Sequence, residues 1–253
     1  MRPEVSVIVL AHNEGEAIVP CLERILNSIQ LPSEVLVVYD SPDDTSVPWI
    51  EKCQRADPRV VPVLNLFGRG PARAIRFGFS QVVSDITVVT MADGCDDPTQ
   101  IDSLARLVDR GVVVAAASRY ARGGQQIGGP MLKSSLSRLA GLSLHLLARV
   151  GTRDGTNSFK AYSTRFVRMV GIDSDAGFEV GLELVAKARR LRLPVAEIPT
   201  IWLERSSGQS NFKLRKWLLL YLKWYLFAFG PKLSVEQVHR GDTPTPLDRS
   251  APR

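Results

Sequence analysis

The sequence is poor in cysteine and lacks the glycine signatures of two common nucleotide-binding folds. Its three cysteines, Cys21, Cys53 and Cys95, are odd in number and do not have the spacing of a metal site. This pattern indicates a reducing compartment. No Gly-x-Gly-x-x-Gly follows the first predicted strand, and no Walker-type Gly-Lys-Ser/Thr is present. These absences argue against both a dinucleotide-binding fold and a P-loop.

A signal peptide, a spanning segment and internal repeats are also missing. Val5 to Leu10 follow a single arginine and lead into a polar turn rather than a cleavage site, so we expect no signal peptide. The apolar runs around Lys223 are too short for a membrane-spanning helix, which needs about 20 apolar residues. The sequence therefore predicts a cytoplasmic protein.

The composition is that of one large folded domain with a positive charge. Of the 253 residues, 45% are hydrophobic and 23% are charged, which is ordinary for a folded α/β protein. The formal charge is +6, and the basic residues concentrate after Arg119. Such a surface suits an anionic partner. We do not expect that partner to be a nucleic acid, because the basic residues do not accompany an aromatic-studded groove.

Short β-branched runs alternate with helical periodicity over the first half of the chain. This rhythm predicts an α/β fold with a mixed, mainly parallel sheet flanked by helices. The predicted strands are 5–10, 34–39, 60–64, 86–91 and 112–117, and the predicted helices include 18–29, 45–56, 71–82, 98–110 and 132–150. We expect one domain over residues 1–212, a helix over 213–231, and a Pro-rich, disordered tail over 232–253.

Acidic residues follow two of the predicted strands where each strand ends. Asp40 follows strand 34–39, and Asp93, Asp96 and Asp97 follow strand 86–91. Ligands of open α/β sheets bind at the carboxyl ends of the strands, and an acidic cluster there can hold a divalent cation that in turn holds a diphosphate. The alternative is that these carboxylates cap the following helices. Two such turns favour a shared nucleotide site.

A series of further motifs follows in a fixed order along residues 4–215. They are Val9-Leu-Ala-His-Asn-Glu14, Val37-Val-Tyr-Asp-Ser-Pro-Asp-Asp-Thr45, Gly68-Arg-Gly-Pro-Ala-Arg-Ala-Ile-Arg-Phe-Gly78, Met91-Ala-Asp93, Ala117-Ser-Arg-Tyr120, Asp154-Gly-Thr-Asn-Ser-Phe-Lys-Ala-Tyr162 and Arg205-Ser-Ser-Gly-Gln-Ser210. This ordered series resembles glycosyltransferase family 2 with the GT-A fold. The resemblance is strongest to the polyprenyl-phosphate sugar transferases of the dolichol-phosphate-mannose synthase type.

The resemblance implies a site for a nucleotide-sugar donor and a cation, Mg²⁺ or Mn²⁺. The implied nucleotide-binding residues are Ala11, Asn13, Glu14, Asp40, Arg69 and Ala92, and the implied metal ligands are Asp93, Cys95 and Asp96. The sequence departs from the family at Met91, which replaces the first aspartate of Asp-x-Asp, and at Tyr39, which replaces an aspartate of the nucleotide turn. Cys95 is a poor ligand for magnesium because a thiol is soft.

The resemblance also implies a set of acceptor and catalytic residues. Arg119, Lys133, Ser137 and Arg138 would hold an acceptor phosphate, Arg205 and Lys213 the donor phosphates, and the catalytic set would be Asp93, Arg119, Arg205, Glu183 and Asp154.

Each of these assignments has a structural alternative. Arg205 is alternatively a solvated surface arginine. Lys133 and Arg138 alternatively form the polar side of a helix whose apolar side carries five leucines, namely Leu136, Leu139, Leu142, Leu146 and Leu147. Asp154 and Glu183 would face the donor sugar or serve as a base, or would be buried acids paired with a local cation.

The helix predicted over 213–231 combines basic residues at its start with Trp217, Tyr221, Trp224 and Tyr225. This composition suits a helix that lies in a membrane interface. A dimer contact in a homo-oligomer, or packing on the catalytic core, is the alternative.

Together these features predict an inverting, metal-dependent transferase, peripheral at the inner membrane face, that moves a sugar from a nucleotide to a polyprenyl phosphate. The alternatives are a family 2 transferase with a saccharide hydroxyl as acceptor, and a non-catalytic nucleotide-sugar binder.

Overall fold

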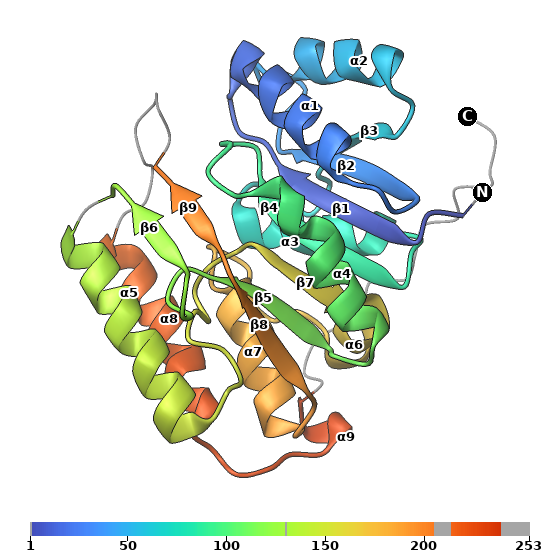
Figure 1. Ribbon diagram of the computed structural model, residues 1–253. Coiled ribbons are helices and arrows are strands. Elements are labelled where there is room, and N and C mark those ends of the chain that lie inside the picture. The colour runs from blue at the N-terminus through green and yellow to red at the C-terminus, as the bar shows by residue number, and fades with distance from the viewer. Residues whose placement is uncertain (1, 130, 205–213, 239–253) are drawn as a thin grey trace.

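The computed structural model describes residues 2–129, 131–204 and 214–238 (Figure 1). A seven-stranded sheet with the order β3-β2-β1-β4-β7-β5-β8 forms the centre, and β6 and β9 pair in a small second sheet. The strands are β1 (Val5–Leu10), β2 (Ser33–Tyr39), β3 (Val60–Leu64), β4 (Ile86–Met91), β5 (Val114–Ser118), β6 (Gln125–Ile127), β7 (Lys160–Ser163), β8 (Val195–Pro199) and β9 (Ile201–Leu203). The predicted α/β class with a mixed, mainly parallel sheet is confirmed.

Helices cover both faces of the central sheet (Figure 1). They are α1 (Ile18–Ser28), α2 (Val47–Ala56), α3 (Pro71–Gln81), α4 (Ile101–Asp109), α5 (Met131–Ser143), α6 (Thr164–Val170), α7 (Val180–Arg190), α8 (Leu214–Ala228) and α9 (Val235–Val238). Short 3₁₀ turns at Gly15–Ala17 and Pro98–Gln100 precede α1 and α4, and a π-helical segment, Leu144–Ala148, continues α5.

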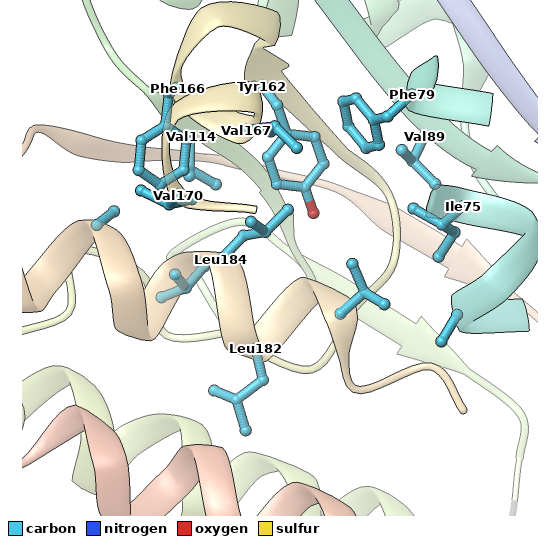
Figure 2. Close-up of a cluster of buried hydrophobic side chains, with 14 of the residues drawn as sticks. Ile75, Phe79, Val89, Val114, Tyr162, Phe166, Val167, Val170, Leu182 and Leu184 are labelled. Atoms are coloured by element: carbon cyan, nitrogen blue, oxygen red, sulfur yellow. The ribbon is translucent and has the colours of Figure 1, made fainter. Parts of the chain in front are cut away.

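The central strands are buried on both faces because their side chains alternate between two cores. In β1, Ile8 and Leu10 belong to the core under α3 and α7, whereas Val7 and Val9 belong to the core under α1 and α4. Figure 2 shows part of the first core, in which the Tyr162 ring of β7 meets that of Phe79 edge to face at 5.8 Å. Both faces must therefore be apolar, as the β-branched runs require.

Strand β7 runs antiparallel to both of its neighbours, β4 and β5. It is inserted between two strands that the chain visits earlier, so the sheet combines a parallel half, β3-β2-β1-β4, with a mixed half. The residues that precede β7 therefore reach the edge of the sheet where β4 and β5 end. The sequence prediction placed no strand at β6, β7, β8 or β9.

The apolar side of α5 faces outward rather than into the core. Its five predicted apolar residues, Leu136, Leu139, Leu142, Leu146 and Leu147, are 43–71% exposed. Helix α8 lies beside α5 (Figure 1), and the hydroxyls of Ser143 and Tyr225 form a hydrogen bond of 2.9 Å between the two helices. Helix α8 also exposes Leu218, Leu219, Leu222 and Leu226. We call these nine residues the leucine face.

The opposite side of α8 packs on α7. Trp224 is 3% exposed, its Nε1 donates to the Ser174 hydroxyl at 2.9 Å, and the Lys187 ammonium lies 5.4 Å from its ring centroid. Helix α8 is therefore anchored to the core by one side while it exposes leucines on the other. Within the described residues, no helix is long and apolar enough to cross a membrane.

The segment after α8 forms the first part of the predicted tail, and its residues up to 238 are described. Leu233 donates its backbone N–H to the carbonyl of Arg190 at 2.9 Å, and Val238 at the end of α9 is 3% exposed. Residues 232–238 thus include α9, whose Val238 packs on the core, while the predicted bounds of the domain and of the disordered tail remain predictions. The rest of the tail, 239–253, lies outside the described residues.

Gly141 sets how closely α5 approaches the rest of the domain. A Cβ at this position would overlap the backbone carbonyl oxygen of Arg153, the residue before Asp154. Since backbone cannot rotate away as a side chain can, we expect Gly141→Ala to lower the free energy of unfolding by about 1–3 kcal/mol despite the better helix propensity of alanine. Urea denaturation measures this value. The exposed Ser135→Ala on the same helix is the control, and equal stability of the two variants would contradict the prediction.

Candidate active site

Three neighbouring parallel strands, β2, β1 and β4, end at the same edge of the sheet. Ala11 and Ala92 follow β1 and β4, and their backbone N–H groups extend the ladder by donating to Val38 and Leu10, each at 3.0 Å. Asp40 follows β2, and Asp93 follows Ala92. The structure thus brings together the strand-end residues that the sequence predicts for a nucleotide and a cation.

The turn after β1 is held by a buried carboxylate from the next strand-helix connection. Asp44, 5% exposed, accepts from the backbone N–H of Asn13 at 3.0 Å and of Ser46 at 2.8 Å. Asn13, with a left-handed φ of +56°, accepts in turn from the Thr45 N–H at 3.3 Å, and the Glu14 N–H donates to the Ser46 hydroxyl at 2.9 Å. Asp44 therefore joins the turn after β1 to the turn after β2 by hydrogen bonds. The sequence motifs did not reveal this role.

Asp40 shapes the glycine turn that carries Arg69. Its two carboxylate oxygens accept from the Asn65 side-chain amide and from the Gly70 backbone N–H, each at 2.8 Å. Gly70 has a φ of +121°, a conformation that residues with a Cβ rarely adopt. Arg69 is exposed at the tip of this turn. Asp40 thus contributes by fixing the loop beside the site.

The turn after β4 places Asp93 at the sheet edge and turns Cys95 inward. The Asp93 carboxylate accepts from the Cys95 N–H at 3.1 Å, across Gly94 with a φ of +70°. The Cys95 thiol is 4% exposed and donates to the Asp93 carbonyl at 3.8 Å, while the Cys95 carbonyl accepts from the Leu203 N–H at 3.1 Å. The predicted ligand role of Cys95 therefore lacks support from the side-chain position.

Asp96 is close enough to Asp93 for the two negative charges to interact. Its carboxylate accepts from the Thr90 hydroxyl at 2.8 Å. Burial, followed by the charge of Asp93, raises the pKa of Asp96 to about 7. Two carboxylates that repel each other in this way suit a hard divalent cation. Within the described residues, no three His, Cys, Asp or Glu side chains are grouped for a metal, so a cation here would need further ligands such as phosphates.

Asp97 has the other role that the sequence allows for an acid at a helix start. Its carboxylate accepts from the Thr99 backbone N–H at 3.1 Å and from the Thr99 hydroxyl at 2.7 Å. Asp97 is therefore the cap of the 3₁₀ turn before α4.

Arg119, directly after β5, forms a buried ion pair with Asp154. Its Nε and Nη2 donate to the two oxygens of Asp154 at 2.7 and 2.9 Å, and its backbone N–H donates at 3.0 Å. Asp154 is fully buried, and the Arg119 side chain is 13% exposed. Burial alone would raise the pKa of Asp154, but the charge of Arg119 and its hydrogen bonds leave this pKa below its usual value.

Lys160 adds a second buried cation that sequence reasoning did not assign. It is fully buried at the start of β7, and its Nζ donates to the carbonyls of Gly155 and Asn157. Burial lowers the pKa of Lys160 to about 8, and the charge of Asp154 opposes that shift. The signal that the sequence offered was a lysine flanked by the apolar residues Phe159 and Ala161 within the motif 154–162.

Helix α5 brings Ser137 and Arg138 to the Arg119 side of the site. The Ser137 hydroxyl lies 2.7 Å from that of Thr156, which also lies 3.5 Å from Nη2 of Arg119. Arg138 is exposed. The Arg119 guanidinium lies 5.0 Å from the Tyr120 ring centroid. Burial raises the pKa of the Tyr120 hydroxyl, and the charges of Arg119 and Arg138 partly oppose this rise. Three of the four predicted acceptor residues therefore gather here; the side chain of Lys133 lies outside the described residues.

Glu183 lies elsewhere, inside α7. Its carboxylate is fully buried, accepts from the backbone N–H groups of Asp173 and Ser174 at 2.6 and 2.9 Å, and pairs with Lys187 at 2.6 Å. This position matches the buried, paired acid that was the alternative to a base. Arg205 and Lys213, predicted to hold the donor phosphates, lie outside the described residues.

Comparisons with known proteins agree with this arrangement. A model of the family described as glycosyl transferase family 2 matches residues 6–169. An undecaprenyl-phosphate mannosyltransferase of Micrococcus luteus is 26% identical over 212 residues, with 82% of this chain and 86% of the relative covered. A dolichol-phosphate mannosyltransferase of Pyrococcus furiosus is 29% identical over 218 residues, with 83% of this chain and 59% of the relative covered.

Two solved structures share the fold. Glucosyl-3-phosphoglycerate synthase from Mycobacterium tuberculosis, in complex with Mn²⁺, uridine diphosphate and glucosyl-3-phosphoglycerate, has a TM-score of 0.64 at 18% identity, with 92% of this chain and 82% of that chain covered. A mannosyltransferase from Pyrobaculum calidifontis, in complex with GDP-Man and Mn²⁺, has a TM-score of 0.62 at 18% identity, with 98% of this chain and 67% of that chain covered.

The ion pair of Arg119 with Asp154 yields a stability prediction. Asp154→Asn removes the charge that compensates a buried guanidinium, so we expect the free energy of unfolding to fall by about 3–5 kcal/mol. The control is Asp85→Asn, whose carboxylate is 90% exposed and lies 3.6 Å from Arg2. This exposed pair should contribute less than about 1 kcal/mol. Chemical denaturation of both variants checks the difference, and equal losses would contradict the buried pair.

The raised pKa of Asp96 predicts a pH dependence of stability. A carboxyl group whose pKa is higher in the folded than in the unfolded state stabilises the fold when it is protonated. Its contribution is complete below the unfolded value of about 4 and is lost as the pH rises through about 7. With EDTA present, we expect wild type to lose at least about 1 kcal/mol relative to Asp96→Asn between about pH 5 and pH 8. Parallel pH profiles would contradict the prediction.

Proposed function

The chain belongs to glycosyltransferase family 2, and from this premise we propose that it transfers a sugar from a nucleotide-sugar donor to a polyprenyl phosphate, with inversion, at a membrane surface. The observation that carries the proposal is the position of α5. This helix presents Ser137 to Thr156, which also contacts Arg119, and its Arg138 is close enough to Tyr120 to lower the pKa of that hydroxyl. Another side of α5 and its π-helical continuation exposes the first five residues of the leucine face. A polyprenyl phosphate combines a phosphate group, which the polar side chains of this helix could bind, with a long apolar chain, which its exposed leucines could contact.

The donor half of the proposed site consists of the turns after β1, β2 and β4. Ala11, Asn13, Glu14, Asp40, Arg69 and Ala92 would surround the nucleotide, with Asp44 and Asn65 holding their turns in place. Asp93 and Asp96 would hold Mg²⁺ or Mn²⁺ together with the diphosphate. When bound, such a cation supplies charge that stabilises the leaving nucleoside diphosphate. Asp93 alone survives from the family's Asp-x-Asp, and the mutual repulsion of Asp93 and Asp96 is the property that a cation would relieve.

The acceptor half needs cations rather than a base. A phosphate monoester, with a second pKa near 6, is largely dianionic at neutral pH and is itself a nucleophile. Arg119, Ser137 and Arg138, with Lys133 from the same helix, would orient it. Asp154 holds two of the guanidinium nitrogens of Arg119, which fixes that side chain in place before the acceptor arrives. Pre-organised charge of this kind lowers the free energy of a transition state more than charge that must first reorient.

A hydroxyl acceptor, the alternative, would require a general base. The two carboxylates that the sequence offers for this role are both engaged, Asp154 by Arg119 and Glu183 by Lys187. This engagement favours the phosphate acceptor. The curated relatives named above are mannosyltransferases with undecaprenyl or dolichyl phosphate in their names, which supports the same choice.

The leucine face supports the peripheral membrane position. Leu139, Leu147, Leu219 and Leu226 are each at least 60% exposed. Apolar side chains of this number, presented by two neighbouring helices, bind the boundary between headgroups and acyl chains in interfacial helices. The cytoplasmic face of the membrane is proposed because the sequence has few cysteines, without the spacing of a metal site or a disulfide framework.

The proposal predicts a lipid-linked product. Radiolabelled UDP-glucose and GDP-mannose are incubated with Mn²⁺ and undecaprenyl phosphate in detergent, and label should move into the organic phase with at least one donor. Label found only in a water-soluble product would refute the lipid acceptor. No turnover, combined with Mn²⁺-dependent nucleotide binding by calorimetry, would instead support a non-catalytic binder.

The acceptor half is tested separately with Arg138→Gln. Loss of one charge-assisted contact, worth about 1.5–3 kcal/mol, should raise the KM for undecaprenyl phosphate about 10- to 100-fold. The KM for the donor should not change. Arg106→Gln, an exposed arginine on α4, is the matched control. An unchanged KM for the acceptor in Arg138→Gln would remove this residue from the proposed site.

A further inference from the structure

A cationic cavity lies at the end of the sheet opposite to the candidate active site. It measures about 650 Å³ and is lined by Arg149, Val150, Gly151, Arg189, Arg192, Leu193, Val195, Pro231 and Lys232. Val195 is the first residue of β8 and pairs with Val114, the first residue of β5, whereas Arg119 follows the other end of β5. The cavity is therefore separate from the donor and acceptor halves described above.

The lining is positive and contains no acidic residue. Four of the nine residues are cations, and none of these four takes part in a salt bridge recorded among the described residues. Like charges within one concave surface repel each other, and an anion in the cavity would relieve that repulsion. A volume of this size fits a phosphorylated small molecule or headgroup rather than a single atom.

The cavity is built by three segments that are fixed to one another. Arg189 on α7 donates to the carbonyl of Ala148, at the end of the π-helical segment, at 2.7 Å and to the carbonyl of Gly230, after α8, at 3.1 Å. Arg190 donates to the carbonyls of Phe227 and Pro231. Arg189 and Arg190 therefore hold α7, the end of the π-helical segment and the segment after α8 together by hydrogen bonds. Arg149, Arg192 and Lys232 lie on or next to these connected segments.

Arg149 and Arg192 both have left-handed backbone conformations, with φ of +56° and +58°. Glycine or asparagine adopts this conformation at lower cost. Arginine is thus not the residue that the turn itself favours at these two positions. Because both arginines line the same cavity, we infer that their charged side chains have a function there.

We propose that this cavity binds a phosphate group, and that the group belongs to the headgroup of an acidic phospholipid. The apolar surroundings favour the lipid source. Leu146 and Leu147 lie three and two positions before Arg149, and Leu226 and Phe229 lie five and two positions before Pro231. These four side chains are 39–71% exposed. The cavity residues Arg149, Pro231 and Lys232 follow the ends of the π-helical segment and of α8, the elements that carry the leucine face. A membrane against this face would therefore bring headgroups near the cations.

The test compares two triple variants with the same change in charge. The cavity variant is Arg149→Gln/Arg192→Gln/Lys232→Gln, which spares the bracing Arg189. The control is Arg55→Gln/Arg106→Gln/Arg110→Gln, with three exposed arginines on α2 and at the end of α4. Both are measured with vesicles of phosphatidylcholine, with vesicles of phosphatidylcholine mixed with phosphatidylglycerol, and with inorganic phosphate by calorimetry.

We expect the cavity variant to bind the phosphatidylglycerol vesicles about 10- to 100-fold more weakly than wild type, and the control to stay within about threefold. If only the inorganic phosphate titration separates the two variants, the cavity binds a free phosphate instead of a headgroup, and the lipid assignment is overturned while the anion site stands. If the two variants behave alike in all titrations, the site itself is refuted.

Folding and activity are checked alongside. Should the cavity variant fail to fold, Lys232→Glu against Arg55→Glu gives the same comparison with single exposed positions. Because the cavity is remote from the donor and acceptor halves, sugar transfer in detergent should be unchanged in the cavity variant. If wild type shows no sugar transfer, the proposed function is contradicted, but the cavity proposal stands or falls on the vesicle binding alone.

Discussion

The buried ion pair of Arg119 with Asp154 is the interaction on which the geometry of the site depends. It joins the end of β5 to the segment that leads into the antiparallel strand β7, and it places a fixed positive charge beside the acidic turn after β4. A guanidinium that is 13% exposed is tolerated only because the carboxylate opposite it is ionised and accepts three hydrogen bonds from Arg119. Burial shifts the pKa of Lys160, and both members of the pair also act on it, whereas Asp96 is affected by burial and Asp93 first and by Arg119 to a smaller extent.

The two halves that we propose for the site, for donor and for acceptor, are built in different ways. The donor half is a set of turns after parallel strands, held by carboxylates that accept from backbone N–H groups, as Asp44 does for Asn13 and Asp40 for Gly70. The acceptor half relies on a helix, α5, that approaches the domain through Gly141 and leaves its leucines exposed. The first half is rigid by virtue of backbone hydrogen bonds, and the second is open toward an apolar partner.

Sequence reasoning located the parallel half of the sheet closely. Strands 5–10, 60–64 and 86–91 were predicted with the bounds found, because strands buried on both faces must be apolar without interruption. It missed β7, because pairing between strands distant in the chain leaves no local period. It also treated the leucines of α5 as an ordinary apolar side, since periodicity shows that a helix has two sides but not which one meets the core. Likewise, Asp40 was predicted as a strand-end acid and Asp44 lies in the same motif, but their hydrogen bonds to the backbone of Gly70 and Asn13 join residues 30 and 31 positions apart.

Strand β9 and the residue after it form hydrogen bonds to both proposed halves of the site. Its Leu203 N–H donates to the carbonyl of Cys95 in the acidic turn, while the next residue, Glu204, accepts from the backbone N–H of Gly129 just ahead of α5. A shift of either turn must stretch or relax the same short strand. If binding of the donor and binding of the acceptor both shift β9, each would change the affinity for the other by the same factor. The two affinities would then be linked rather than independent.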